Sequence, residues 1–116
     1  MNAYDQAHAL ARAMKDSEEY REYQRLREIA HQDETNRALL EEYKRLQYRL
    51  QAKAATGESV PEEDMTRLTQ IGTLLQFNPD VSAYMLAELR FQRMLADIFK
   101  ILADVAGIDL DMLSQG

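Results

Sequence analysis

The sequence predicts an all-α protein, an elongated bundle of about five helices with two long helices, and a dimer mediated by helix contacts. With 46% hydrophobic and 29% charged residues, the chain is too apolar to be disordered. It has only four Gly and two Pro, too few turn residues for a many-stranded sandwich. Apolar residues recur in helical steps of three and four. At 116 residues, we expect one helical domain covering residues 1–116.

The first third of the sequence predicts two helices that end at a kink or short break. Residues 2–15 place apolar side chains on one helical face. Asp16 and Ser17 supply a natural N-cap for a second helix. This second helix ends in a polar segment at residues 31–35, in which Asp33 can act as the N-cap of the next helix. We therefore expect a kink or short break near residue 32.

The middle of the chain predicts two helices that reverse direction. From Asp33 to Ala55 a near-heptad stripe indicates packing against a neighbour: Leu39, Tyr43, Leu46, Leu50 and Ala54. Residues 56–61 (TGESVP) interrupt this pattern, with Gly57 ending the helix and Ser59 expected to form a capping box with Glu62. The next inner face is expected to contain Met65, Leu68, Ile71, Gly72, Leu75 and Phe77. Asn78-Pro79 should end this helix and cap the following one.

The last helix, about residues 79–106, has the broadest apolar stripe. Its 28 residues would span about 42 Å, which exceeds the diameter of a compact protein of this chain length. We therefore expect an elongated monomer. A two-fold partner is the commonest way to cover such a stripe. Phe91 and Ile98 are expected at the centre of the apolar stripe, and Arg90 and Lys100 on the solvent-exposed face of the helix. The predicted dimer or partner interface is Tyr84, Ala87, Phe91, Met94, Leu95, Ile98, Ile101, Leu102 and Val105. Gly107 should stop the helix, and Ile108–Leu113 could form one amphipathic turn.

Charge and composition exclude several classes of function. The net charge of −6 disfavours direct nucleic-acid binding, and residues 59–116 carry nine acids against four bases. Without Cys there is no disulfide, thiolate metal site or thiol nucleophile, and with only two His we expect neither an enzyme nor a cofactor. No apolar run approaches the ~18 residues of a membrane span, and the opening MNAYD lacks the layout of a signal peptide. We expect a cytoplasmic protein.

Two groups of residues leave other sites open. Glu28 and His31 share the Glu-x-x-His spacing of di-iron carboxylate bundles, with Asp5 and His8 as the nearest second copy. The alternative is an ordinary solvated pair at a helix end. A basic face beside Tyr48 could track phosphates or stack bases: Arg37, Lys44, Arg45, Arg49 and Lys53. The favoured alternative is a solvated face with Glu41–Arg45 and Asp33–Arg37 pairs.

Three segments resemble one known family. They are AHALARAMKDSEEY at residues 7–20, HQDE at 31–34 leading into LLEEY at 39–43, and NPDVSAY at 78–84. The chain resembles the YlbF/YmcA family of Bacillus-type bacteria over nearly its whole length. That resemblance implies an all-helical, dimer-forming cytosolic protein. Better-known members act with partner proteins as regulators of competence, biofilm formation and sporulation, and as accessory factors of an endoribonuclease that matures messenger RNA.

One feature separates this chain from some of those members. Some carry C-terminal cysteines linked to iron–sulfur clusters, whereas this sequence ends Ser114-Gln115-Gly116. It is similar in length to shorter, cysteine-less members. The favoured interpretation is a non-enzymatic regulatory or adaptor protein that works through helix-face contacts. The alternatives are a structural or holdase-like helical dimer and a metal-binding bundle that uses Glu28, His31, Asp5 and His8.

Overall fold

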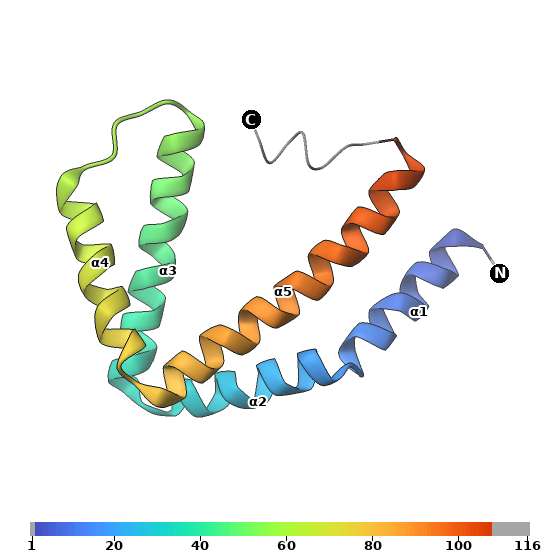
Figure 1. Cartoon of the computed structure of the whole chain (residues 1–116), viewed down its shortest axis with the longest axis horizontal. Helices are drawn as coiled ribbons and strands as arrows, with labels where there is room; N and C mark the ends of the chain where they lie inside the picture. Colours follow the sequence, from blue (N-terminus) through green and yellow to red (C-terminus); the bar gives the residue numbers. More distant parts are fainter. Residues whose placement is uncertain (1, 108–116) are drawn as a thin grey trace. The chain divides into compact units, whose positions relative to one another are not determined.

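A computed structural model describes residues 2–107, and this part of the chain forms five α-helices and no strand (Figure 1). The helices are α1 (Ala3–Lys15), α2 (Glu18–Gln32), α3 (Glu34–Ala55), α4 (Glu62–Gln76) and α5 (Pro79–Val105). The prediction of an all-α fold with two long helices is therefore confirmed. Gly107 follows α5 with a φ of +72°, as expected of a helix-stopping glycine. The amphipathic turn predicted for Ile108–Leu113 lies outside the described residues.

Polar side chains start the helices where the sequence predicted. The Ser17 hydroxyl accepts a hydrogen bond from the Tyr20 N–H at 3.2 Å, in the first turn of α2. The Asp33 carboxylate accepts from the Asn36 N–H at 3.0 Å and separates α2 from α3, so the break near residue 32 is real. The Asn78 side chain accepts from the N–H groups of residues 80 and 81, at 3.0 and 3.1 Å, and caps α5.

The chain divides into two compact units. One contains the residues up to Tyr23 together with those from Leu86 onward, and the other is Gln24–Met85. The division falls within α2 and within α5. Each unit is described by itself below, and the prediction of a single domain over residues 1–116 stays a prediction.

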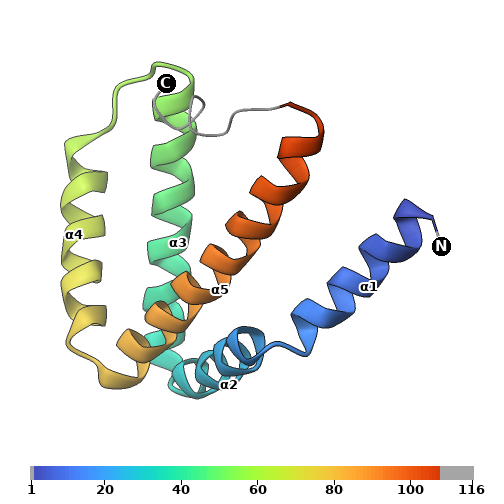
Figure 2. The same ribbon diagram turned by 45° about the vertical axis from the view of Figure 1, so that its right-hand side comes forward.

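In the unit Gln24–Met85, α3 and α4 form an antiparallel hairpin (Figures 1 and 2). The end of α3 is a Schellman motif, in which the Glu58 N–H donates to the Lys53 carbonyl at 2.9 Å. Gly57 has a φ of +76°, which favours a residue without Cβ. The predicted Ser59–Glu62 capping box is wrong, because Pro61 is the N-cap and α4 has no side-chain cap hydrogen bond. Proline fixes the extended entry to α4 by itself.

The hydrophobic core of this unit is made from four helices. Its buried residues are Ala30, Leu40, Leu46, Leu50, Ile71, Leu75, Val81 and Tyr84. Gly72 lies where α4 faces α3, and a Cβ there would lie 3.4 Å from Cε2 of Tyr43, an ordinary van der Waals contact.

Four positions in the hairpin differ from the predicted apolar faces. Leu40 is buried where Leu39 was predicted, and Ala54 is exposed near the end of α3. Met65 and Phe77 are exposed because they lie in the first turn of α4 and at its C-cap, away from the centre of the hairpin. Apolar spacing alone did not indicate which side of each helix its neighbour would cover.

Candidate functional site

In the other unit, α5 is joined to α2 by a cluster of aromatic rings. Tyr20 and Tyr23 are three residues apart, so both rings lie on one face of α2. The Phe91 ring lies against them, with centroid distances of 5.5 Å to Tyr20 and 5.4 Å to Tyr23. The planes are tilted by 59° in the first pair and stacked at 26° in the second. Such pairs are worth about 0.5–1.5 kcal/mol each beyond the area they bury.

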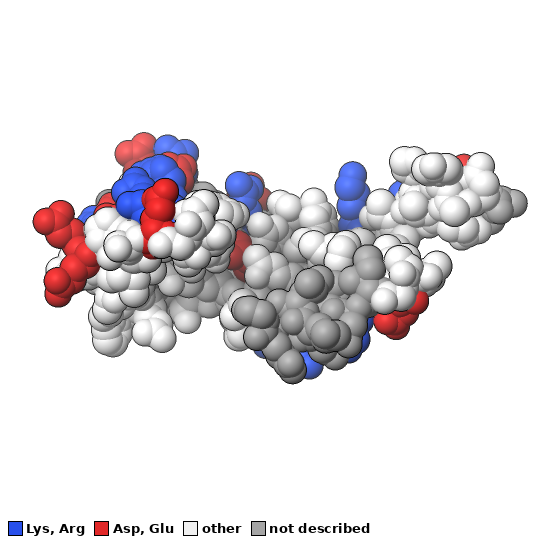
Figure 3. Space-filling view, turned by 90° about the horizontal axis from the view of Figure 1, so that it is seen from above, with Lys and Arg blue, Asp and Glu red and all other residues white. Residues whose placement is uncertain are grey.

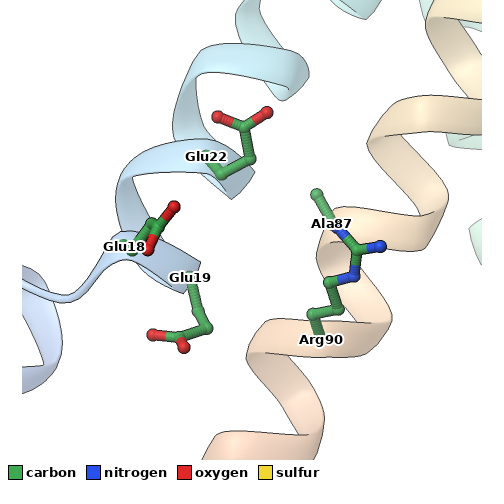
Figure 4. Close-up of a pocket in the computed structure, with 5 residues that line it drawn as sticks. All are labelled: Glu18, Glu19, Glu22, Ala87 and Arg90. Atoms are coloured by element: carbon green, nitrogen blue, oxygen red, sulfur yellow. The ribbon is translucent and has the colours of Figure 1, made fainter.

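Two adjoining hollows lie beside this cluster, between the first turns of α2 and the middle of α5. The first has a volume of about 140 Å³ and is lined by Glu18, Glu19, Glu22, Ala87 and Arg90 (Figure 4). The second is lined by Glu19, Arg90, Arg93, Met94, Asp97 and Ile98. Because they share Glu19 and Arg90, we treat them as one feature, the α2–α5 groove. The groove was not predicted from the sequence, because its walls come from residues about 70 positions apart.

The nine residues predicted as an interface on α5 fall into three groups. Tyr84 and Ala87 are buried within the chain. Half-buried positions are Phe91, Met94 and Ile98. The exposed ones are Leu95, Ile101, Leu102 and Val105.

Phe99 is exposed as well and lies between Leu95 and Leu102 at steps of four and three. Leu95, Phe99 and Leu102 are therefore neighbours on one side of α5, and we call them the α5 stripe. Their exposed fractions are 47%, 58% and 55%. A large apolar side chain that stays half in water is ordinary when it occurs singly, whereas these three neighbours form a continuous apolar patch.

Two residues of the basic face of α3, Lys44 and Arg49, make contacts within their own unit. Lys44 donates to the Tyr84 hydroxyl at 3.0 Å, and an Arg49 nitrogen lies 3.7 Å from an Asp64 oxygen. Tyr48 is exposed. At the loop end of α3 and α4, on the left of Figure 3, basic and acidic side chains are interleaved on the visible face. This mixture does not resemble a continuous phosphate-tracking surface.

A second ion pair crosses from α3 to α4. The Arg67 guanidinium donates two hydrogen bonds to Glu42, from Nε to Oε2 at 2.7 Å and from Nη2 to Oε1 at 2.8 Å. These hydrogen bonds, together with the charges of Arg67 and Arg45, hold the pKa of Glu42 below its ordinary value of 4.5. The same carboxylate raises the pKa of Arg67. Both partners are partly exposed on the surface, so the pair contributes only modestly to stability.

His31, one residue of the metal-site alternative, makes contacts within the chain. The Nδ1 of His31 lies 2.8 Å from the Arg27 carbonyl oxygen, one turn earlier on α2. Its ring meets the Tyr84 ring edge-on, with centroids 5.6 Å apart. Within residues 2–107, no three His, Asp or Glu side chains are grouped so that they could hold a metal ion. The Glu-x-x-His spacing of Glu28 and His31 therefore gains no support from the structure.

Comparisons with known proteins give the family. Residues 3–105 match the family described as "Control of competence regulator ComK, YlbF/YmcA". The chain belongs to the YlbF/YmcA family. A UPF0342 protein of Clostridium tetani is 35% identical over 115 residues, 99% of each chain. The UPF0342 protein YheA of Bacillus subtilis is 30% identical over 102 residues, 88% of this chain and 87% of its own. The resemblance predicted from the helix caps and apolar steps is confirmed.

Solved structures show the same fold. A protein of unknown function (DUF964) from Bacillus stearothermophilus has a TM-score of 0.76 at 21% identity, covering 90% of this chain and 91% of that one. Bacillus subtilis RicA, solved in complex with RicF, gives a TM-score of 0.60 at 18% identity, covering 90% and 92%. At these identities the likeness shows the YlbF/YmcA fold alone. None of the helices within residues 2–107 is long and apolar enough to span a membrane.

Proposed function

We propose that this YlbF/YmcA protein is a non-enzymatic regulatory adaptor that acts through helix-face contacts with proteins, and that it is a homodimer in the cytoplasm. The observation that carries the proposal is the α5 stripe, three large apolar side chains exposed side by side on one helix. The family description, which names control of a competence regulator, supports a regulatory role. The related RicA structure, solved in complex with RicF, supports a role in protein assembly.

The dimer is assigned to the α5 stripe for a physical reason. An isologous interface needs a self-complementary patch, and a single apolar row on a helix can pack against its own copy. Tyr84 and Ala87 are left out of this interface because they are already buried within the chain. Phe91 is left out because it packs on Tyr20 and Tyr23. The interface we propose is therefore centred on Leu95, Phe99 and Leu102.

Sedimentation equilibrium tests the dimer. The wild type should have about twice the chain mass of 13.4 kDa at micromolar concentration. We expect Leu95→Glu to raise the dissociation constant at least about tenfold, since it places a charge in the interface. Leu86→Glu is the matched control. Leu86 is equally exposed, at 49%, and lies about two and a half turns earlier on α5, on the opposite side of the helix. A wild type that stays monomeric, or an equal effect of both variants, would contradict the assignment.

Affinity capture from the source cells, with nuclease added, tests the adaptor role. An adaptor should return one or two stoichiometric proteins, because a dedicated helix face selects its partner. A spread of unfolded clients would instead support the holdase-like alternative. Sub-micromolar binding to single-stranded RNA at about 150 mM salt would overturn the proposal if it is lost when Arg45, Arg49 and Lys53 are changed to Glu.

A further inference from the structure

The α2–α5 groove has walls of different charge. The α2 wall presents three carboxylates, those of Glu18, Glu19 and Glu22, and Figure 4 shows Arg90 facing them from α5. Further along α5, Arg93 and Asp97 border the second hollow. In total the walls carry four carboxylates and two guanidinium groups, so the groove as a whole is negative. A ligand that fits this charge is basic.

The floor of the groove is apolar and follows a helix. Met94 and Ile98 are half-buried and four residues apart, so they lie in line along α5. Ile101 and Val105, three and seven residues beyond Ile98, continue this line and are exposed. From Ala87 to Ile98, which line the hollows, it is about 16 Å long; with Ile101 and Val105, which lie beyond the hollows, it reaches about 27 Å, the length of a helix of roughly five turns. An elongated apolar track of this length is the shape that an amphipathic helix fills when it binds in a groove.

We propose that the α2–α5 groove binds a basic amphipathic helix of a protein partner. The partner's apolar stripe lies on Met94, Ile98, Ile101 and Val105, and its Lys or Arg side chains meet the carboxylates of α2. This inference rests on the proposed role in protein contacts and adds the chemistry of the partner. The line of the groove is centred about a quarter turn of α5 away from the α5 stripe, and the two surfaces adjoin at Ile98, which lies next to Leu95 and Leu102.

A synthetic helix provides the probe. It is an 18-residue peptide (about five turns) with Leu at helical steps of three and four, Lys on both flanks and one Trp. The protein contains no Trp, so the emission of that residue reports on the peptide alone. We expect saturable binding to the wild-type protein. A second peptide in which every Lys is replaced by Glu should not bind, because the groove would repel it.

Two double variants separate the groove from the net charge of the protein. Glu18→Gln with Glu19→Gln removes two carboxylates from the groove. The matched control, Glu62→Gln with Glu63→Gln, also removes two exposed carboxylates from the first turn of a helix, α4. We expect the groove variant to weaken binding of the Lys peptide by about three- to tenfold and the control to change it less than about twofold.

Three results would overturn the proposal: equal losses in the two double variants, equal binding of the Lys and Glu peptides, or no saturation by about 1 mM peptide. Circular dichroism of each variant checks that α2 and α4 keep their helical content. Sedimentation of the same samples reports the dimer separately. Peptide binding without a dimer would contradict only the proposed dimer, and a dimer without peptide binding would contradict only the groove.

Discussion

Lys44 donates a hydrogen bond from Nζ to the hydroxyl of Tyr84 at 3.0 Å, and so links α3 to the first turns of α5. The Tyr84 side chain is only 1% exposed, and its ring fills the core while its hydroxyl meets a cation. The same ring lies against His31 from α2. Tyr84 thus connects three helices of the Gln24–Met85 unit.

Removing the Tyr84 hydroxyl should therefore be costly. We expect Tyr84→Phe to lower the free energy of unfolding by about 1–2 kcal/mol, because the hydrogen bond to a charged donor is lost while the ring remains. Urea unfolding followed by circular dichroism measures the change. Tyr48→Phe, at a side chain 70% exposed, is the control and should stay within about 0.5 kcal/mol of wild type. Equal effects of the two substitutions would show that the Tyr84 hydroxyl contributes no more to stability than an exposed hydroxyl.

Two adjacent leucines on α4 should differ strongly. Leu75 is 1% exposed in the core, whereas Leu74 is 56% exposed on the other side of the helix. Leu75→Ala leaves a cavity and should destabilise by about 2–5 kcal/mol. Leu74→Ala should cost less than about 1 kcal/mol. The midpoint of thermal unfolding, measured for both variants at the same concentration, distinguishes them, and a larger effect at Leu74 would contradict the orientation of α4.

Two glycine substitutions should have opposite signs. Gly57 has a φ of +76°, where a Cβ is strained, so Gly57→Ala should destabilise by about 1 kcal/mol. Gly72 lies inside α4 with helical φ, and a Cβ there would make an ordinary contact with Tyr43 at 3.4 Å. Alanine is the better helix former, so Gly72→Ala should stabilise by about 0.5–1 kcal/mol. Chemical denaturation of both variants tests this, and destabilisation at Gly72 would mean that the hairpin has no room for a methyl group.

The Glu42–Arg67 pair makes stability depend on pH. Because the folded pKa of Glu42 lies below 4.5, the pair stabilises the folded state fully above that ordinary value. The contribution is lost as the pH falls through the lowered pKa, where the carboxylate is protonated in both states. Wild type should therefore be more stable than Glu42→Gln at pH 7, and the difference should vanish in acid. Glu41→Gln, one residue away on the exposed face, is the control at pH 7 for removing a surface carboxylate without breaking the Glu42–Arg67 pair.

The sequence predicted features that depend on neighbouring residues. The caps at Ser17, Asp33 and Asn78 and the turn at Gly57 were all found, because a cap or turn is decided within about four residues. The Ser59–Glu62 capping box failed since Pro61 already sets the helix entry. Features formed between distant residues could not be predicted. Arg67 meets Glu42 across 25 positions, and nothing in either local sequence indicates that pairing.

The candidate site, too, could be predicted from the sequence only in part. Helical spacing correctly placed large apolar residues along α5, yet it treated Tyr84 and Val105 alike, although one is buried and the other 89% exposed. Burial depends on which helices cover each part of α5, and spacing along a single helix does not contain that information. The α2–α5 groove was missed for the same reason.

The residue that caps α5, Asn78, is also protected against deamidation through a succinimide. Asparagine deamidates when the backbone nitrogen of the following residue attacks its side-chain amide to form a succinimide ring. At Asn78 the following residue is Pro79, whose nitrogen carries no hydrogen, so this route is blocked. The Asn78 oxygen that accepts from residues 80 and 81 is therefore not converted to a carboxylate by way of a succinimide.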